Sequence, residues 1–316
     1  MQATITQILA ALKAADTIII HRHQNPDPDA FGSQGGLAAA LTAAYPEKTV
    51  LKAGEPDAGL AWITTPDAVP AEAYANAVVV VIDTANTPRI AGAHWQDGKQ
   101  LIKIDHHPDR ESFGGLSFVD TDASSCSEIV ADMIAASTDL QLTKSVAAML
   151  YAGIIGDTGR FLYDLTTPHT HEVAADLMRT GIDAPALGRA ESDYTPSIAH
   201  LEAYALGNMQ VSPHGAGSLF ITQKVIEELG LQPGEAQAAV STVGKLTTVQ
   251  SWVMFTERAD GQWRVELRSK NWPINQLAVK HGGGGHPLAS GAVAKNLDEC
   301  QQIIQELDAL NAEQQA

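Results

Sequence analysis

The chain has 316 residues, of which 45% are apolar and 18% are charged, a balance typical of a globular protein long enough for two domains. Twenty basic residues against 37 acidic ones give a net charge of −17. This charge excludes a long binding surface for duplex nucleic acid, because such binding needs many Lys and Arg contacts to phosphates. No apolar run is long enough to span a membrane, and the N-terminal segment lacks the features of a signal peptide. With only two cysteines, Cys126 and Cys300, a cytoplasmic protein without a disulfide framework is expected.

The first half of the chain alternates apolar, β-rich runs with amphipathic stretches. Residues 1–20 read as a helix that runs into a strand. The pattern predicts buried parallel strands at 17–20, 78–82 and 101–104, and helices at 30–44, 125–136 and 144–155. This alternation predicts an α/β fold with a doubly wound parallel sheet. In such a fold the functional residues lie where the strands end, at their carboxyl edge.

The second half has a different texture. Residues 166–208 are polar and helical in pattern, and a mixed or mostly antiparallel sheet is predicted from three alternating runs at 217–225, 247–258 and 263–269, with helices at 273–280 and 298–310. We therefore predict an N-terminal domain (1–186), a helical linker (187–208) and a smaller C-terminal α/β domain (209–316).

A loop directly after the first predicted strand reads His-Arg-His-Gln-Asn-Pro-Asp-Pro-Asp and contains His23, Asp27 and Asp29. A single Asp at this place would be explained as a helix N-cap. Two Asp and one His in a proline-restrained turn are harder to explain by capping. Their spacing lets the two carboxylates point toward neighbouring positions, one for each of two metal ions.

Three further acidic positions follow apolar segments. Asp83 ends the run Val78–Ile82, the triplet Asp105-His106-His107 ends another strand, and Asp157 ends an apolar helix in Gly-Asp-Thr-Gly. A buried carboxylate at such a place is costly unless a cation balances it. Four aspartates would balance two divalent ions, and mixed Asp and His ligation favours Mn²⁺, with Co²⁺ or Mg²⁺ as substitutes. The residues alone leave open which histidine of the pair is a ligand, and a neighbouring Asp suits the orientation of a ligand histidine.

A glycine run near the C-terminus, Gly282–Gly285, lies between the triplet Arg268-Ser269-Lys270 and His286. A lone glycine run is most often a flexible turn. Beside an Arg that grips phosphate bidentately and a His donor, it predicts an anion-binding pocket for a terminal phosphate or nucleotide. Its surroundings, 241–296, are basic: Lys245, Arg258, Arg264, Arg268, Lys270, Lys280 and Lys295 stand against Glu257, Asp260 and Glu266. Trp252 and Trp263 are predicted to be core residues rather than base-stacking platforms.

Together these motifs resemble the DHH phosphoesterase superfamily, and the C-terminal run from Arg268 to Ala292 resembles its DHHA1 domain. The resemblance covers nearly the whole chain and is nearest to the oligoribonuclease (nanoRNase) and pAp-phosphatase group. It implies one metal ion on His23, Asp27, Asp83 and Asp157, and a second on Asp29, Asp83, His106 and Asp157. It also implies catalytic roles for Asp83, His106, His107 and Asp157. The implied substrate-binding residues are His107, Arg268, Ser269, Lys270, Gly283, Gly284, Gly285 and His286.

The activity that the resemblance implies is Mn²⁺-dependent hydrolysis of RNAs of two to five nucleotides, of dinucleotides such as pApA, and of the 3′-phosphate of pAp. A water activated by two metal ions would attack phosphorus, and closure of the C-terminal domain over the substrate would limit its length. Alternatives are a DHH pyrophosphatase or exopolyphosphatase, a RecJ-like single-strand exonuclease, and a nucleotide-binding sensor without turnover. Neither a membrane nor long duplex nucleic acid is an expected partner, and a homodimer is left open.

Overall fold

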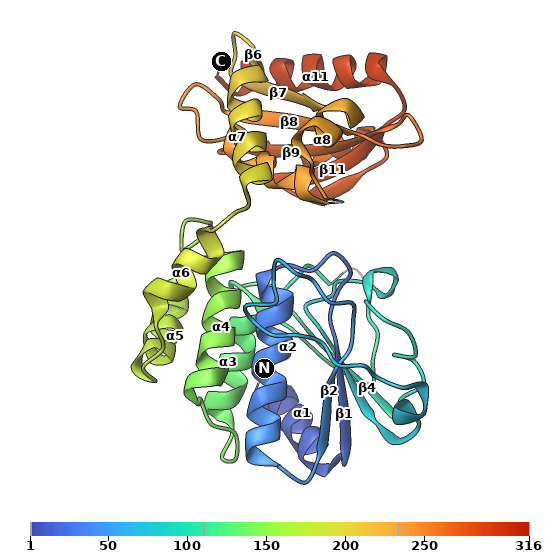
Figure 1. Cartoon of the computed structure of the whole chain (residues 1–316), viewed down its shortest axis with the longest axis vertical. Coiled ribbons are helices and arrows are strands. Elements are labelled where there is room, and N and C mark those ends of the chain that lie inside the picture. The colour runs from blue at the N-terminus through green and yellow to red at the C-terminus, as the bar shows by residue number, and fades with distance from the viewer. Residues whose placement is uncertain (1, 110, 233, 316) are drawn as a thin grey trace. The chain divides into compact units, whose positions relative to one another are not determined.

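Residues 2–109, 111–232 and 234–315 are described by a computed structural model, in which the chain forms two compact units (Figure 1). The first unit spans Met1–Asp193 and the second Tyr194–Ala316. The division therefore lies inside the segment 187–208, which the sequence predicts as a linker. Within the described ranges, no helix is both long and apolar enough to cross a membrane.

A five-stranded parallel sheet in the order β2-β1-β3-β4-β5 forms the centre of the first unit. Its strands are Thr17–His21 (β1), Thr49–Lys52 (β2), Val78–Ile82 (β3), Gln100–Asp105 (β4) and Leu116–Val119 (β5). The three predicted strands are confirmed, whereas the short edge strands β2 and β5 are not predicted by the sequence. The direction in which the sheet grows reverses between β1 and β3, so the loops that follow these two strands lie side by side at the carboxyl edge.

The helices of the first unit are Gln2–Ala14 (α1), Pro28–Ala44 (α2), Cys126–Ala136 (α3), Lys144–Asp157 (α4), Pro168–Arg179 (α5) and Ala184–Ser192 (α6), with 3₁₀ turns at Ala71–Asn76 (η1) and Thr87–Arg89 (η2). The α2, α3 and α4 helices run side by side (Figure 1). Side-chain oxygens of Asp27, Ser125 and Thr143 accept hydrogen bonds from the first turns of these three helices and fix where each one begins.

Alternating side chains of the central strands supply two hydrophobic cores. Ile18, Ile20 and Ile104 belong to a core that the helices cover, while Ile19 and Val79 belong to a second core with Tyr74 of η1. The α/β class with a parallel sheet is thus confirmed. The second face of this sheet is covered by η1 and loops rather than by long helices.

A six-stranded mixed sheet in the order β10-β11-β9-β8-β7-β6 forms the second unit, and only the β7–β8 pair is parallel among these strands. Its strands are Gln210–Val211 (β6), Ala216–Ile221 (β7), Ser251–Glu257 (β8), Trp263–Ser269 (β9), Gly284–His286 (β10) and Ala289–Ala294 (β11). The mostly antiparallel sheet is as predicted. Its first predicted run extends too far, because the chain leaves the sheet after Ile221.

The helices of the second unit are Pro196–Asn208 (α7), Gln223–Leu229 (α8), Val240–Val243 (α9), Asn275–Lys280 (α10) and Leu297–Gln315 (α11), with a 3₁₀ turn at Glu235–Ala239 (η3). One face of the sheet packs on α10 and α11, and the other packs on α7, η3 and α9. The side chains of Trp252 and Trp263 are buried. Both are core residues, as predicted.

Candidate metal centre

Side chains from four separate segments meet at the carboxyl edge of the parallel sheet. The loop after β1 brings His23 and Asp27, the first turn of α2 brings Asp29, and Asp83 follows β3 directly. His106 follows β4, and Asp157 is the last residue of α4. Three triads made up of predicted site residues have ligand atoms that all lie within 4.8 Å of one another: His23 with Asp27 and Asp83, Asp29 with His106 and Asp157, and Asp83 with His106 and His107. Asp83 is common to two of these triads.

A buried arginine fixes the loop that follows β1. The Arg22 guanidinium lies 4.2 Å from the centroid of the Phe31 ring, and its Nη1 donates to the His23 carbonyl at 3.2 Å. Its Nη2 donates to the carbonyl of Glu55. Burial lowers the pKa of Arg22 to about 10, so the side chain keeps its charge at neutral pH. The sequence did not indicate this role, because the bond to Glu55 joins residues 33 positions apart.

The imidazoles of His23 and His106 share one arrangement, with Nδ1 at a backbone carbonyl and Nε2 toward Asp83. His23 Nδ1 lies 2.8 Å from the carbonyl oxygen of Gln24, and its Nε2 faces Asp27 and Asp83 at 3.4 Å each. His106 Nδ1 lies 3.4 Å from the carbonyl of Ala123, and its Nε2 faces Asp83 and Asp157 at 3.5 and 3.2 Å. A backbone carbonyl at one ring nitrogen fixes the tautomer that leaves the other as a metal ligand.

The second histidine of the pair is bound differently. His107 Nδ1 lies 2.9 Å from Asp105 Oδ1 and 3.5 Å from Asp83 Oδ1. The nitrogen that faces the cluster is therefore already engaged by the Asp105 carboxylate. This contrast with His106 favours His106 as the metal ligand of the pair and His107 as a neighbour, a choice that the residues alone left open.

Asp29 receives hydrogen bonds from the beginning of a helix far away in the sequence. Its Oδ2 accepts from the backbone N–H of Cys126 at 2.7 Å, and its Oδ1 accepts from that of Ser127 at 2.8 Å. The N-terminus of α3 thereby fixes the carboxylate, as expected for an anion at a helix N-terminus. Cys126 also lies within 4.8 Å of Asp29 and Asp83, a neighbour that the sequence did not indicate.

The electrostatics of the cluster are strongly coupled. Burial would lower the pKa of His23, but the ion pairs with Asp27 and Asp83 outweigh it and raise that pKa to about 11. The pKa of His106 is raised well above its usual value, because its pairing with Asp83 outweighs burial. Burial and the charge of Asp83 raise the pKa of Asp29 to about 7, and burial with the charge of Asp29 raises that of Asp157. Three carboxylates this close repel one another unless protons or cations balance them.

The donor set suits divalent metal ions. His23 Nε2 and Asp83 Oδ1 are buried atoms without a hydrogen-bond partner, although such atoms are usually satisfied in proteins. Both are oriented toward the other ligand atoms. Asp83 adopts a left-handed backbone conformation with φ of 53°, and strain of this kind is concentrated at functional sites. Mixed carboxylate and imidazole donors suit a divalent transition-metal ion.

Glycines let the helices around this cluster approach closely. A Cβ on Gly153 of α4 would lie 2.0 Å from Ser127 Oγ and 2.8 Å from Asp29 Oδ1. We expect Gly153→Ala to destabilise the protein by about 1–3 kcal/mol in chemical denaturation, as overpacking does, and to weaken metal binding by displacing Asp29.

The matched control is Gly188→Ala in α6, where an added Cβ meets no atom within 4 Å. There the higher helix propensity of Ala should leave stability unchanged or raise it by up to about 1 kcal/mol. Equal stability of the two variants would contradict the close packing around Asp29.

The predicted residues of the C-terminal motif lie on neighbouring strands of the second sheet. Arg268 of β9 and His286 of β10 both pair with Ala289 of β11, and directly paired residues share a face of the sheet. The second half of the glycine run belongs to a strand pair, because Gly284 and Gly285 of β10 pair with Gly291 and Ser290 of β11. Just before this strand, a Cβ on Gly283 would lie 2.0 Å from the Gly291 carbonyl. Only its first and last residues have positive φ, 75° at Gly282 and 147° at Gly285.

The basic character of this segment is largely neutralised within the second unit. Lys245, Arg258, Arg264 and Lys280 each form an ion pair with an acidic side chain. Lys270 Nζ donates to the Leu246 carbonyl at 2.7 Å. The local surplus of positive charge therefore gives less support to anion binding than the sequence count suggests.

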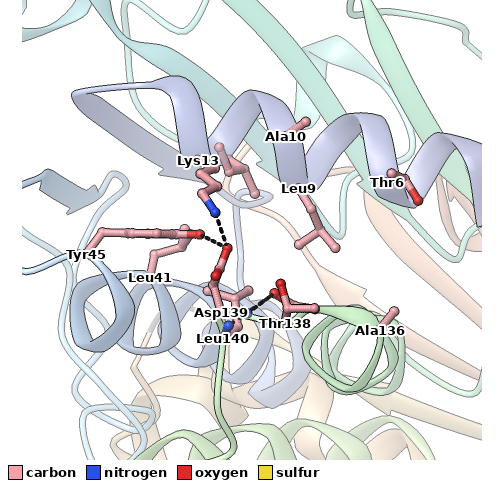
Figure 2. A pocket seen from close by; sticks show the side chains of 12 residues that line it. Thr6, Leu9, Ala10, Lys13, Leu41, Tyr45, Ala136, Thr138, Asp139 and Leu140 are labelled. Carbon is pink, nitrogen blue, oxygen red and sulfur yellow. Dashed lines mark hydrogen bonds and ion pairs between the residues drawn. The ribbon is translucent and has the colours of Figure 1, made fainter.

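A hollow of about 310 Å³ elsewhere in the first unit is not part of this centre. It lies between α1 and the C-terminal ends of α2 and α3 (Figure 2). The candidate metal ligands lie at the other end of α2, whose 17 residues span about 25 Å. Figure 2 shows Lys13 and Tyr45 directed at Asp139, to which they bond at 2.7 and 3.0 Å. These bonds within the protein account for the polar side chains that line the hollow.

Family models and full-length relatives match both units of the chain. The model of the DHH family N-terminal domain matches residues 17–154, and that of the DHHA1 domain matches residues 218–313. A probable bifunctional oligoribonuclease and PAP phosphatase NrnA of Streptococcus mutans is 48% identical over 96% of this chain and 97% of its own length. The bifunctional oligoribonuclease and PAP phosphatase NrnA of Bacillus subtilis is 40% identical over 96% and 98%.

The fold is also that of a solved structure. An exopolyphosphatase-related protein from Bacteroides fragilis aligns with a TM-score of 0.88 at 24% identity, covering 99% of this chain and 98% of that one. The identities of the relatives, the two domain matches and the order of the motifs lead to one assignment. This chain belongs to the DHH family of hydrolases, with an N-terminal DHH domain followed by a DHHA1 domain.

Proposed function

We propose that this protein hydrolyses very short oligoribonucleotides, including pApA-like dinucleotides, and removes the 3′-phosphate of pAp, with two divalent ions of which Mn²⁺ fits best. The convergence of six ligand side chains at one edge of the sheet carries this proposal. The names of the relatives that cover nearly the whole chain support its substrate class.

The metal ions would be held by two groups of side chains, and the resemblance assigns Asp83 to both ions. His23, Asp27 and Asp83 are one group, and Asp29, His106 and Asp157 lie together beside it; the resemblance also assigns Asp157 to the first ion. When bound, such a pair lowers the pKa of an attacking water and neutralises charge on the phosphoryl oxygens. Asp27 keeps a half-exposed side chain, so this end of the cluster is open to a ligand.

The chain's own groups supply orientation and charge. His107 is fixed through Nδ1 by Asp105, and we assign its ring to the phosphoryl group of the substrate. Arg268 and His286, with Ser269, Lys270 and Gly283–Gly285, are assigned to the distal phosphate or nucleotide. A protein with a net charge of −17 repels a long polyanion but tolerates a short one that few cations hold.

The test of this function is a panel of substrates. A 5′-labelled RNA dinucleotide, a long single-stranded RNA, pAp and pyrophosphate would each be incubated with Mn²⁺ or with EDTA, beside an Asp157→Ala protein. We expect rapid Mn²⁺-dependent loss of the dinucleotide and of pAp, and none with Asp157→Ala.

If only pyrophosphate were hydrolysed, the proposed metal centre would be retained, but the proposed substrate class would be wrong. Rapid loss of the long RNA would favour a RecJ-like exonuclease. If the protein bound these substrates but hydrolysed none of the four, a nucleotide sensor would be favoured.

Arg268→Ala tests the role of the second unit. A charge-assisted hydrogen bond to phosphate is worth about 1.5–3 kcal/mol, so we expect KM for the dinucleotide and for pAp to rise by about 10-fold to 100-fold, with kcat changed much less. Metal binding should be unaffected. The matched control is Arg258→Ala, which removes an arginine that is ion-paired with Asp260 and should leave KM unchanged. Unchanged KM in Arg268→Ala would remove Arg268 from the binding site.

A further inference from the structure

A lysine is buried in the middle of β4, one of the strands that end at the metal centre. The side chain of Lys103 has no exposed surface, which is rare for lysine unless it is paired. Ile102 and Ile104 on either side of it belong to the helix-covered core. Lys103 points to the other face, where its Nζ lies 4.8 Å from the centroid of the Phe113 ring.

The ammonium group connects two loops that carry metal-centre residues. Lys103 Nζ donates to the carbonyl of Ala85, two residues after Asp83, at 3.2 Å. It also donates to the carbonyl of Glu111 and to Asp109 Oδ1, both at 3.1 Å. These acceptors follow β3 and β4, so one buried charge fixes the loop of Asp83 relative to the loop of the histidine pair.

The same ammonium faces the carboxylate that orients the histidine pair. Lys103 Nζ lies 3.6 Å from Asp105 Oδ2, and neither side chain has exposed surface. The two oxygens of Asp105 have separate partners. Oδ1 accepts from the backbone N–H groups of His106 and His107 and lies 2.9 Å from His107 Nδ1. Oδ2 has no hydrogen bond, and the nearby ammonium balances its charge.

We propose that Lys103 is a positioning residue for the hydrolytic reaction. It is the buried counter-charge that holds Asp105 in place, and Asp105 in turn fixes the ring of His107 beside Asp83. An apolar side chain of similar size would fill the same space against Phe113, and buried ion pairs are often replaceable in this way without loss of stability. Lys103 bonds to two loops of the metal centre, and this gives its charge a function beyond packing. The kinetic part of this inference rests on the proposed function.

Three variants separate positioning from packing. Lys103→Met leaves the Asp105 charge buried without a partner, Asp105→Asn removes the charge and the strong acceptor, and the double variant contains neither charge. Melting temperature, kcat and KM for the RNA dinucleotide, and Mn²⁺ affinity would be measured for each. We expect kcat to fall about tenfold or more in both single variants, with KM changed less.

The double variant decides between the two roles. If Lys103 positions His107, the double variant regains the melting temperature of the wild type but keeps the low kcat of Asp105→Asn, so the two effects on kcat do not multiply. If the Lys103–Asp105 pair serves packing alone, Asp105→Asn lowers kcat only through lost stability, so kcat recovers together with the melting temperature in the double variant, and the proposal is overturned. This comparison remains valid if Lys103→Met alone does not fold.

Asp109→Asn is the matched control. It removes another carboxylate partner of the same ammonium, and Asp109 is half exposed, so kcat should stay within about twofold of wild type. If kcat fell as far in Asp109→Asn as in Lys103→Met, the effect would come from the loop that carries Asp109, and the proposed role of Asp105 would be overturned.

A readout without substrate keeps this inference separate from the proposed function. In proton NMR of the wild type, the His107 Nδ1–H that bonds to Asp105 should give a downfield, slowly exchanging signal, which Lys103→Met should shift or broaden. An unchanged signal would overturn the positioning role. Wild-type protein that shows this signal but does not hydrolyse the dinucleotide would overturn only the proposed function.

Discussion

The Asp157→Asn protein is expected to lose at least about 10³-fold in kcat/KM for the RNA dinucleotide, equivalent to about 4 kcal/mol of transition-state stabilisation. In its metal-free form it should nevertheless melt at a higher temperature than the wild type at pH 8. Both effects have one cause. Asp157 lies among Asp29, His106 and Asp83, where its charge serves to hold a cation. Without the cation, that charge destabilises the fold.

The pH dependence of this difference follows from the pKa of Asp157. Burial and the charge of Asp29 raise that pKa in the folded protein. A carboxyl group with a raised folded-state pKa contributes stability that is fully present below its unfolded value and is lost as the pH rises through the folded value. Asparagine does not titrate, so the advantage of the variant should grow as the pH rises from the unfolded pKa of an aspartate toward the raised folded value. Each 1 kcal/mol that is relieved corresponds to a shift of roughly 2–4 °C.

Thermal melts of metal-free protein in EDTA at several pH values would measure this. Asp164→Asn is the matched control, because Asp164 is exposed on the loop that follows, and its replacement should change neither activity nor melting temperature by much. Retention of activity in Asp157→Asn would remove Asp157 from the ligand set. A constant difference in melting temperature at all pH values would exclude charge repulsion as its cause.

The strands that lead to the candidate metal centre are predictable from the sequence because they are mostly apolar and end at or just before acidic or histidine residues. Val78–Ile82 is buried along its whole length and Asp83 follows it, so both the strand and its functional end are visible in the sequence. The edge strand Thr49–Lys52 has one exposed and three partly exposed residues, and so short a run gives no clear periodicity.

Local signals also compete with one another. The segment after Ile221 alternates like a strand, but Thr222 caps the first turn of α8 and Gly230 ends it with φ of 64°. The capping signal was the better predictor. A lone glycine run favours a turn by composition. In the fold, Gly284 of β10 pairs with Gly291 of β11. The position of β11 depends in turn on its pairing with β9.

The contacts between distant residues of the centre are the part that the sequence could not supply. Asp29 accepts its hydrogen bonds from Cys126 and Ser127, almost a hundred positions away. The orientation of His106 depends on the carbonyl of Ala123, and the charge balance of Asp105 depends on Lys103. The candidate ligands follow from the motifs together with the family resemblance, which selects His106 over His107. Their tautomers, their pKa values and their supports are properties of the packed structure.

Loading the metal-free protein with Mn²⁺ at pH 7 is expected to release about two or more protons for each pair of ions bound. The folded-state pKa of His23 is about 11, and that of His106 is raised well above its usual value by Asp83. Both imidazoles therefore hold an extra proton at pH 7, which ligation of a metal ion must displace. Asp29, with a pKa of about 7, adds a fraction of a proton.

Calorimetric titration in buffers of different ionisation enthalpy would count these protons. His169→Gln is the matched control: the pKa of His169 is also raised, by Asp132, but it lies on α5, outside the ligand triads, so the count should not change. The stability that the His23 ion pairs give to the metal-free protein is fully present below pH 6.5 and is lost as the pH rises toward 11. Mn²⁺ affinity should rise over the same range, because protons compete less for the ligands. Metal binding without proton release would show that both imidazoles are neutral before the metal arrives, and would contradict the ion pairing within the cluster.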